Sequence, residues 1–177
     1  FAAAPVPRII GTVKVGSTVG VSAGAWSPRP VFDYAWLLDG RAIPGATDDS
    51  LVVTPAMGGH KLQVTVIGAS TGYTTTERTS AATTVVKLKF TKTAKPVIHG
   101  TAKVGRKLTV SVGKWSPKPA FTYRWLANGK TIKGATKSSL KLTKAQAGKR
   151  ITVKVTGTKL GYDSTARTSS ATKKVRR

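Results

Sequence analysis

Lysine and arginine side chains carry the strongest chemical signal in this sequence. The 177 residues contain 30 Lys and Arg but only 6 Asp and Glu, which gives a formal net charge of +24. The excess lies almost entirely in residues 90–177, which hold 22 basic residues and one acid, whereas residues 1–89 hold 8 and 5. A small domain with so much positive charge repels itself and attracts polyanions. We therefore expect the second half of the chain to bind an anionic polymer.

The candidate polyanion-binding residues are cations of the second half, most of which the first half lacks at the corresponding positions. They are Arg106, Lys107, Lys114, Arg124, Lys137, Lys141, Lys144, Lys154, Lys159, Lys173, Lys174, Arg176 and Arg177. Lysine supplies most of the excess, and its compact ammonium suits diffuse attraction to phosphate better than the bidentate contacts that read bases. Non-specific nucleic acid or an acidic polysaccharide would be attracted by the same positive electrostatic potential. Solubility alone is the simpler alternative explanation of the charge.

Trp26 and Trp115 are the candidates for carbohydrate binding. Each precedes a Ser-Pro-x-Pro sequence that is typical of a loop. An exposed tryptophan flanked by prolines can stack on a sugar ring, so both are hypothetical glycan-stacking residues. The structural alternative, which we favour, is that the two rings cover the end of a core.

Groups for catalysis or metal binding are sparse. The second half has one carboxylate, Asp163, and one histidine, His99, and the chain has no cysteine for thiol chemistry, disulfides or zinc. Asp39, Asp48 and Asp49 lack the dense alternation of a calcium loop. No glycine pattern for phosphate or dinucleotide binding is present. We expect no enzyme, no cofactor and no metal, with a Ser-His-Asp site assembled from both halves as the least favoured alternative.

No apolar run approaches the roughly 18 residues that a bilayer crossing needs, so we expect no membrane span. The sequence begins with Phe1 and shows no signal peptide. We expect this start to be a cut inside a longer precursor.

The elements that must position these side chains occur twice. A shift of 89 residues aligns the two halves without a gap, from Phe1 on Phe90 to Leu88 on Arg177. Residues 11–16 (GTVKVG) return as 100–105 (GTAKVG), and all twelve aromatic residues fall into matched pairs. We predict two tandem domains, residues 1–89 and residues 90–177.

Each half is rich in Val, Thr and Gly and has short period-two runs, which predict half-buried strands. The runs of the second half are Leu108, Val110 and Val112, then Leu140 and Leu142, then Ile151, Val153 and Val155. Asp39-Gly40 and Asn128-Gly129 predict two-residue hairpin turns of type I′. About seven strands in each half, with Trp36 or Trp125 on a central one, predict an all-β fold of two sandwiches.

Several strings in both halves resemble the bacterial immunoglobulin-like repeats of secreted actinobacterial proteins. They are Pro-x-Ile-x-Gly-Thr-x-Lys-Val-Gly, Trp-Ser-Pro, Tyr-x-Trp, Ile-x-Gly-Ala-Thr and a final Gly-Tyr. The resemblance covers both halves almost end to end. It implies two tandem immunoglobulin-like β-sandwich domains, of the kind appended to extracellular hydrolases, in which Trp36 and Trp125 are the core tryptophans. Antibody-type cysteines are absent, so packing alone must hold the core.

The resemblance and the charge together lead to one functional expectation. The chain is a non-catalytic accessory module of a secreted or surface protein, extracellular or at the cell surface and monomeric within a longer chain. Its basic second domain attaches it to an anionic cell-wall polymer, teichoic acid or an acidic polysaccharide. The alternatives are pure structural spacer repeats, or a carbohydrate-binding module that uses Trp26 and Trp115.

Overall fold

The computed structural model describes residues 1–177 and divides them into two compact units, Phe1–Leu88 and Lys89–Arg177. We call these the first and the second unit. Both are built from short strands with one 3-10 turn each, and neither contains a helix that could reach across a bilayer.

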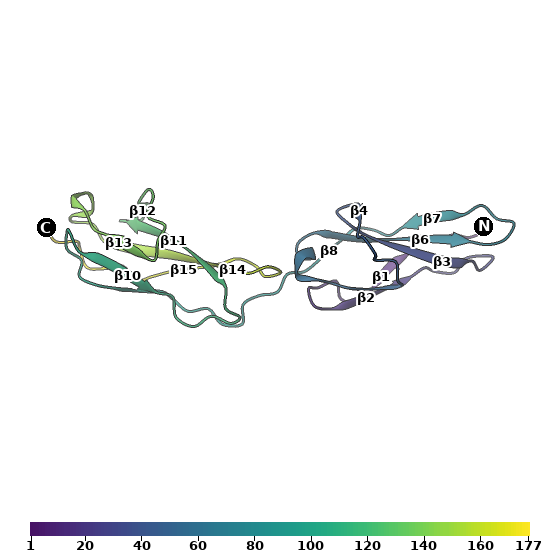
Figure 1. The fold of residues 1–177 in the computed structure, drawn as a ribbon, viewed down its shortest axis with the longest axis horizontal. Coiled ribbons are helices and arrows are strands. Elements are labelled where there is room, and N and C mark those ends of the chain that lie inside the picture. The colour runs from purple at the N-terminus through teal and green to yellow at the C-terminus, as the bar shows by residue number, and fades with distance from the viewer. The chain divides into compact units, whose positions relative to one another are not determined.

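The first unit is a sandwich of two antiparallel sheets (Figure 1). One sheet has the order β1-β2-β5 and the other β4-β3-β6-β7, with β8 also paired to β6. The strands are β1 (Arg8–Ile10), β2 (Thr18–Ser22), β3 (Val31–Leu38), β4 (Arg41–Ala42), β5 (Ser50–Val52), β6 (Lys61–Ala69), β7 (Thr76–Thr79) and β8 (Thr83–Thr84). The chain crosses between the sheets after β2, after β4 and after β5, so β3 and β6 become neighbours although β5 lies between them in sequence. This is the arrangement of an immunoglobulin-like sandwich.

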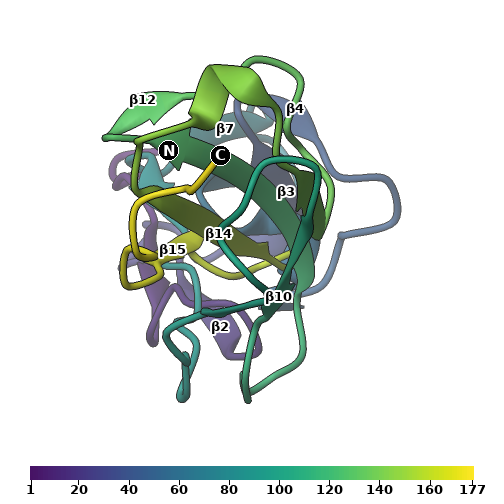
Figure 2. The same ribbon diagram turned by 90° about the vertical axis from the view of Figure 1, so that its left-hand side faces the viewer.

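The second unit repeats the architecture, with sheets β13-β10-β9 and β12-β11-β14-β15 in separate layers (Figure 2). Its strands are β9 (Val97–His99), β10 (Lys107–Ser111), β11 (Ala120–Ala127), β12 (Lys130–Thr131), β13 (Ser139–Lys141), β14 (Ile151–Thr158) and β15 (Thr165–Thr168). The predicted fold class, all-β with two tandem immunoglobulin-like sandwiches, is confirmed.

The two predicted hairpin turns have the predicted backbone. Asp39 and Gly40 have φ values of 51° and 77°, and Asn128 and Gly129 have 47° and 79°. Two consecutive positive φ angles define a type I′ turn, whose twist matches that of the strands it joins. The turns therefore fix the registers of β3 with β4 and of β11 with β12.

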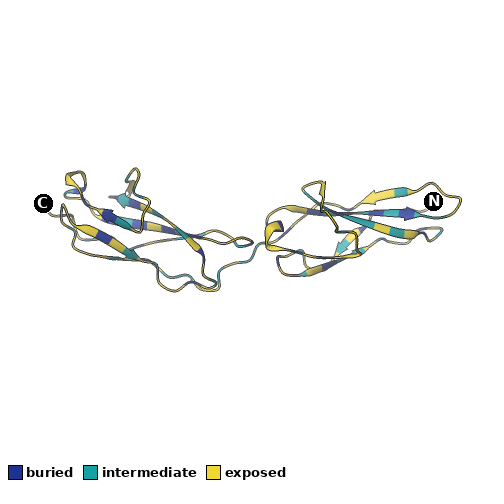
Figure 3. Ribbon diagram, in the orientation of Figure 1, coloured by how far each residue is buried: buried dark blue, intermediate teal, exposed yellow.

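Each unit has its own core, and a tryptophan lies at the centre of each. Trp36 on β3 and Trp125 on β11 are both 0% exposed. Their indole Nε1–H groups donate to the backbone oxygens of Asp48 and Lys137, each at 2.9 Å. Apolar residues from both sheets of the same unit pack around each ring. Burial is concentrated on alternate strand positions, while the turns are exposed (Figure 3).

The end of the second unit departs from the predicted gap-free alignment. The Gly59 N–H donates to the Val85 oxygen in the first unit, and the Gly148 N–H donates to the Val175 oxygen in the second. The glycines are 89 positions apart, but the valines, both buried, are 90 apart. The gap-free register is therefore wrong here, because the second unit has one extra residue between Thr172 and Val175. An insertion near a chain end leaves too little sequence after it to be noticed.

Candidate polyanion-binding surface

All thirteen predicted polyanion-binding residues are exposed. Four lie on the outer faces of strands: Lys107, Arg124, Lys141 and Lys154. The others lie beside the strands, in the connections and in the C-terminal segment. They do not form a single patch, because they occur on both sheets and in several connections of the second unit.

The cations of the second unit have no acidic partners. The one side-chain contact of the structure within ion-pair distance is the hydrogen bond between His60 and Asp39 of the first unit, and none of the 22 Lys and Arg of residues 90–177 forms an ion pair. Asp163, the only acid of these residues, is also unpaired with any of them. Their charge is therefore available to a ligand.

Arg124 and Lys154 lie directly opposite each other on the larger sheet, because β11 pairs with β14 in that register. Both side chains point outward, since their neighbours Trp125 and Val153 are buried in the core. Like charges placed directly opposite on a sheet destabilise it. The first unit has Ala35 opposite Thr65 at these positions, so the fold does not require the two cations.

A shallow hollow of about 390 Å³ lies on this part of the second unit. Arg124 and Lys154 line it, together with three threonines, Thr122, Thr136 and Thr156. Thr122 is opposite Thr156 in the β11–β14 register, so the hydroxyl pair adjoins the cation pair. Thr136 comes from the connection after β12. The hollow thus combines two positive charges with hydroxyls that can donate or accept hydrogen bonds.

A second pair of opposed cations lies on the smaller sheet. Lys107 on β10 is opposite Lys141 on β13, and both are exposed because the adjacent Leu108 and Leu140 face the core. The corresponding pair in the first unit is Thr18 and Val52, which are uncharged. Each sheet of the second unit thus has one like-charge pair that the first unit lacks.

The C-terminal cations belong to the folded unit. Val175 is 2% exposed and its N–H donates to the Lys149 oxygen, while the Arg176 N–H donates to the Ala102 oxygen. This pairing holds Lys174 and Arg176 on either side of a buried residue. A hollow of about 440 Å³ is lined by Lys173, Lys174 and Arg176 with part of the β9–β10 connection.

The candidate glycan-stacking residues are buried. Trp26 and Trp115 are 7% and 9% exposed, and each donates its Nε1–H to a backbone oxygen three residues earlier at 3.0 Å. Trp115 contacts Phe90 and Phe121 edge-on, with ring centroids 5.5 and 5.4 Å away. Trp26 makes the same contacts with Phe1 and Phe32. The two rings therefore take the structural role favoured from the sequence and offer no open platform for a sugar, because aromatic neighbours cover them.

A glycine in the neighbouring strand makes room for each of these rings. A Cβ on Gly157 would lie 2.7 Å from Trp115 Cζ3, and one on Gly68 would lie 2.5 Å from Trp26 Cζ3. Both distances are too short for real carbon contacts. Because glycine has no side chain, each indole ring packs directly against the backbone of the neighbouring strand.

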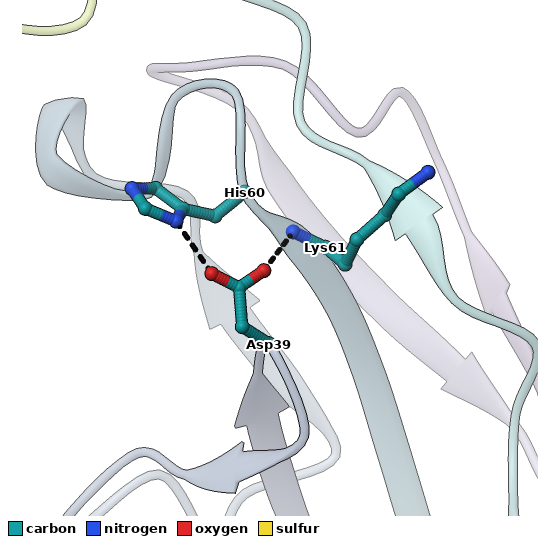
Figure 4. Close-up of polar contacts among 3 residues, drawn as sticks. All are labelled: Asp39, His60 and Lys61. Atoms are coloured by element: carbon teal, nitrogen blue, oxygen red, sulfur yellow. Dashed lines mark hydrogen bonds and ion pairs between the residues drawn. The ribbon is translucent and has the colours of Figure 1, made fainter.

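The first unit contains a polar contact that the sequence did not reveal (Figure 4). Asp39 accepts a 2.8 Å hydrogen bond from the Lys61 backbone N–H through Oδ1 and a 2.7 Å bond from His60 Nδ1 through Oδ2. The Lys61 N–H, followed by His60, lowers the pKa of Asp39. Asn128 Oδ1 in the second unit accepts a hydrogen bond from the Arg150 N–H in the same way, at 2.8 Å. Comparison of Asp39 with Asn128 would have suggested this shared hydrogen bond to the backbone. It would not have suggested the contact with His60, because Lys149 occupies the corresponding position in the second unit.

The electrostatic surroundings of two corresponding tyrosines also differ. Burial, and secondarily the charge of Asp49, raises the pKa of Tyr34 in the first unit. The corresponding tyrosine of the second unit is Tyr123, where Ser138 occupies the position of Asp49 and Lys137 that of Asp48.

No group of three or more His, Cys, Asp or Glu residues that could hold a metal ion occurs in the structure.

No family model and no curated protein matches the chain. Several solved structures are similar to it. They include an ectodomain fragment of ICAM-5, at 12% identity and a TM-score of 0.43, with 92% of this chain and 52% of that one covered. Another is a Ca²⁺-stabilised adhesin with which an Antarctic bacterium binds ice, at 12% identity and 0.40, with 96% and 48% covered.

A third similar structure consists of tandem Ig repeats of Dlar, at 14% identity and a TM-score of 0.26, with 96% of each chain covered. The chain spans about half the length of the ICAM-5 and adhesin chains. The fold assignment itself rests on the strand order and core of each unit.

Proposed function

We infer that this chain is a non-catalytic accessory module that attaches a secreted or surface protein to an anionic polymer of the cell envelope. The second unit makes the contact and the near-neutral first unit acts as a spacer. One observation carries the proposal: residues 90–177 of the second unit expose 22 Lys and Arg without an ion pair, on a fold that the first unit adopts without most of them.

The placement of the cations supports binding over solubility. Solubility is served by charges anywhere on a surface, and mixed signs serve it well. The second unit instead has two pairs of cations directly opposed across strands, which costs sheet stability. An anionic ligand between the members of each pair offsets that cost. A protein that needed only solubility would gain nothing from placing two cations directly opposite each other on paired strands.

The chemistry of the cations favours a phosphate polymer. Most are lysines, which act as compact point charges without a fixed geometry. Such groups suit a flexible chain with regularly spaced charges, as in teichoic acid, whereas an acidic polysaccharide is the alternative ligand of the same sign. The proposed location is extracellular or at the cell surface. Charge repulsion between second units also favours a monomer within a longer protein.

The test is retention of the whole chain on purified Gram-positive walls, with and without teichoic acid, at several salt concentrations. Retention should fall steeply with salt, because binding releases counterions from the polymer. It should also be lost when teichoic acid is removed. Retention that ignores salt would contradict electrostatic attachment.

The same measurement separates the rival functions. No retention under any condition would leave a pure structural spacer. Retention that resists salt and fails in Trp26→Ala or Trp115→Ala chains that still fold would indicate carbohydrate binding, against the burial of both rings. Equal competition by DNA and heparin would indicate a polyanion binder without preference for the wall.

A further inference from the structure

One face of the larger sheet has opposite charges in the two units. In the first unit the outward positions of β3, β6 and β7 include Asp33 and Glu77, both paired in register with Ile67 of β6. The corresponding positions of the second unit are Thr122 and Ala166, paired with Thr156. The same face then gains Arg124 and Lys154 where the first unit has Ala35 and Thr65. This face thus loses two carboxylates at one pair of positions and gains two cations at another.

The cations and hydroxyls of this face converge on one hollow. Arg124 and Lys154 are opposed across β11 and β14, and Thr122 and Thr156 form the next outward pair along the same strands. Thr136 closes the hollow of about 390 Å³ from the connection after β12. No carboxylate lines it. Two charges and three threonine hydroxyls therefore line, together with Phe121 and Tyr123, a space large enough for a small anionic group.

We propose that this hollow is a discrete site for one phosphate group of a phosphodiester polymer, held between Arg124 and Lys154. The proposal rests on the proposed function and adds a location and a ligand group to it. The guanidinium of Arg124 supplies several donors in a planar fork, which match adjacent phosphate oxygens. Lys154 supplies a point charge to the other side of the same group. The phosphate thus replaces the repulsion between the two side chains with attraction to both.

The threonines favour a polymer with hydroxyls beside its phosphates. A threonine hydroxyl donates one hydrogen bond and accepts others, so it can pair with phosphate oxygens and with the hydroxyls of an adjoining polyol. Lysine or arginine in their place would serve the phosphate alone. Thr122, Thr136 and Thr156 therefore suit a polyol phosphate, and the same phosphate chemistry in a nucleic acid is the second source to be distinguished.

The test compares two double variants of the whole chain, each of which removes one opposed cation pair. Arg124→Ala with Lys154→Thr restores the first-unit residues at the proposed site, and Lys107→Thr with Lys141→Val does the same on the smaller sheet. Both remove two positive charges and use residues that the sister unit tolerates. Affinity for lipid-free glycerol-phosphate polymer is measured at fixed salt, and circular dichroism checks the fold.

We expect the Arg124/Lys154 variant to bind about tenfold more weakly than the Lys107/Lys141 variant, since only the former loses charge-assisted hydrogen bonds in a hollow. Equal losses would overturn the site while leaving electrostatic attachment intact. Absence of binding by the unchanged chain would overturn both the site and the proposed function. Stronger binding to single-stranded DNA than to the polyol phosphate, with the same variant effect, would keep the phosphate site but assign it to nucleic acid.

A second measurement locates the bound group directly. Titration of the isotopically labelled whole chain with the same polymer should shift the amide resonances of Arg124, Lys154 and Thr156 more than those of Ala35, Thr65 and Ile67. Poly-glutamate of similar charge is the control for a carboxylate ligand. Equal shifts with poly-glutamate would contradict the preference for phosphate.

Discussion

The two units have matching cores but very different surface charge, and this difference separates the residues that the fold needs from those that it does not. Trp36 and Trp125 are equally buried, with the same hydrogen bond to the same connection. Trp26 and Trp115 have matching aromatic neighbours. In contrast, exposed positions changed from acidic or neutral to basic along the second unit. A sandwich of this type accepts such changes because alternate strand residues face solvent.

Removal of a central tryptophan should have the largest effect and should be the same in both units. Trp36→Ala and Trp125→Ala each leave a cavity and an unpaired backbone oxygen, so each should lower the free energy of unfolding by about 3–5 kcal/mol. Calorimetry of the whole chain should show the loss in the unit that carries the change. A loss twice as large in one unit would show that the cores are not equivalent.

A methyl group at the strand glycines should have the next largest effect. Gly68→Ala and Gly157→Ala each place a carbon against a buried indole ring, which should lower stability by about 1–3 kcal/mol through overpacking. Thermal unfolding followed by tryptophan fluorescence measures it. Thr168→Ala is the control in the second unit, on an exposed position of the same sheet. An unchanged melting temperature in the glycine variants would contradict the tight packing around Trp26 and Trp115.

Relief of a like-charge pair should slightly stabilise the second unit. Lys107→Thr with Lys141→Val removes the repulsion between β10 and β13 and introduces residues that favour strands. We expect a gain of up to about 1 kcal/mol at low salt, shrinking as salt screens the repulsion. Urea unfolding at two salt concentrations checks this. A loss of stability would contradict this prediction, because it would mean that packing by the two lysine side chains stabilises the sheet more than their repulsion destabilises it.

The smallest effect concerns acid stability of the first unit. The folded state lowers the pKa of Asp39, so its contribution is present above the unfolded pKa, near 3.8, and is lost as pH falls through the lower folded value. Asp39→Asn keeps the hydrogen bond to the Lys61 N–H, as Asn128 does in the second unit. The variant should therefore unfold with a shallower dependence on pH below about 4. Unfolding curves at several acidic pH values measure this, and an unchanged dependence would contradict the role of Asp39.

The sequence predicts the strands, the hairpin turns and the central tryptophans because these depend on local alternation and turn residues. It does not predict which exposed cations face each other. Arg124 and Lys154 are 30 positions apart, and their opposition follows from the β11–β14 register, which only the folded sheet displays. The contact between His60 and Asp39 was missed for the same reason. The structural role of Trp26 and Trp115 was the favoured interpretation of the sequence, but their contacts with Phe1 and Phe90 were not predicted, because no local pattern indicates them.

The central claim is that cations added to the second unit, and dispensable to its fold, bind the polymer. One whole-chain variant tests it by restoring the first-unit residues at eight such positions: Arg106→Ser, Lys107→Thr, Lys114→Ala, Arg124→Ala, Lys141→Val, Lys144→Pro, Lys154→Thr and Lys159→Ser. The measurement is retention on teichoic-acid-bearing walls as a function of salt. We expect the variant to stay folded, to be released at much lower salt than the unchanged chain and to show a shallower salt dependence, because fewer counterions are displaced. Retention equal to that of the unchanged chain at every salt concentration would contradict the account.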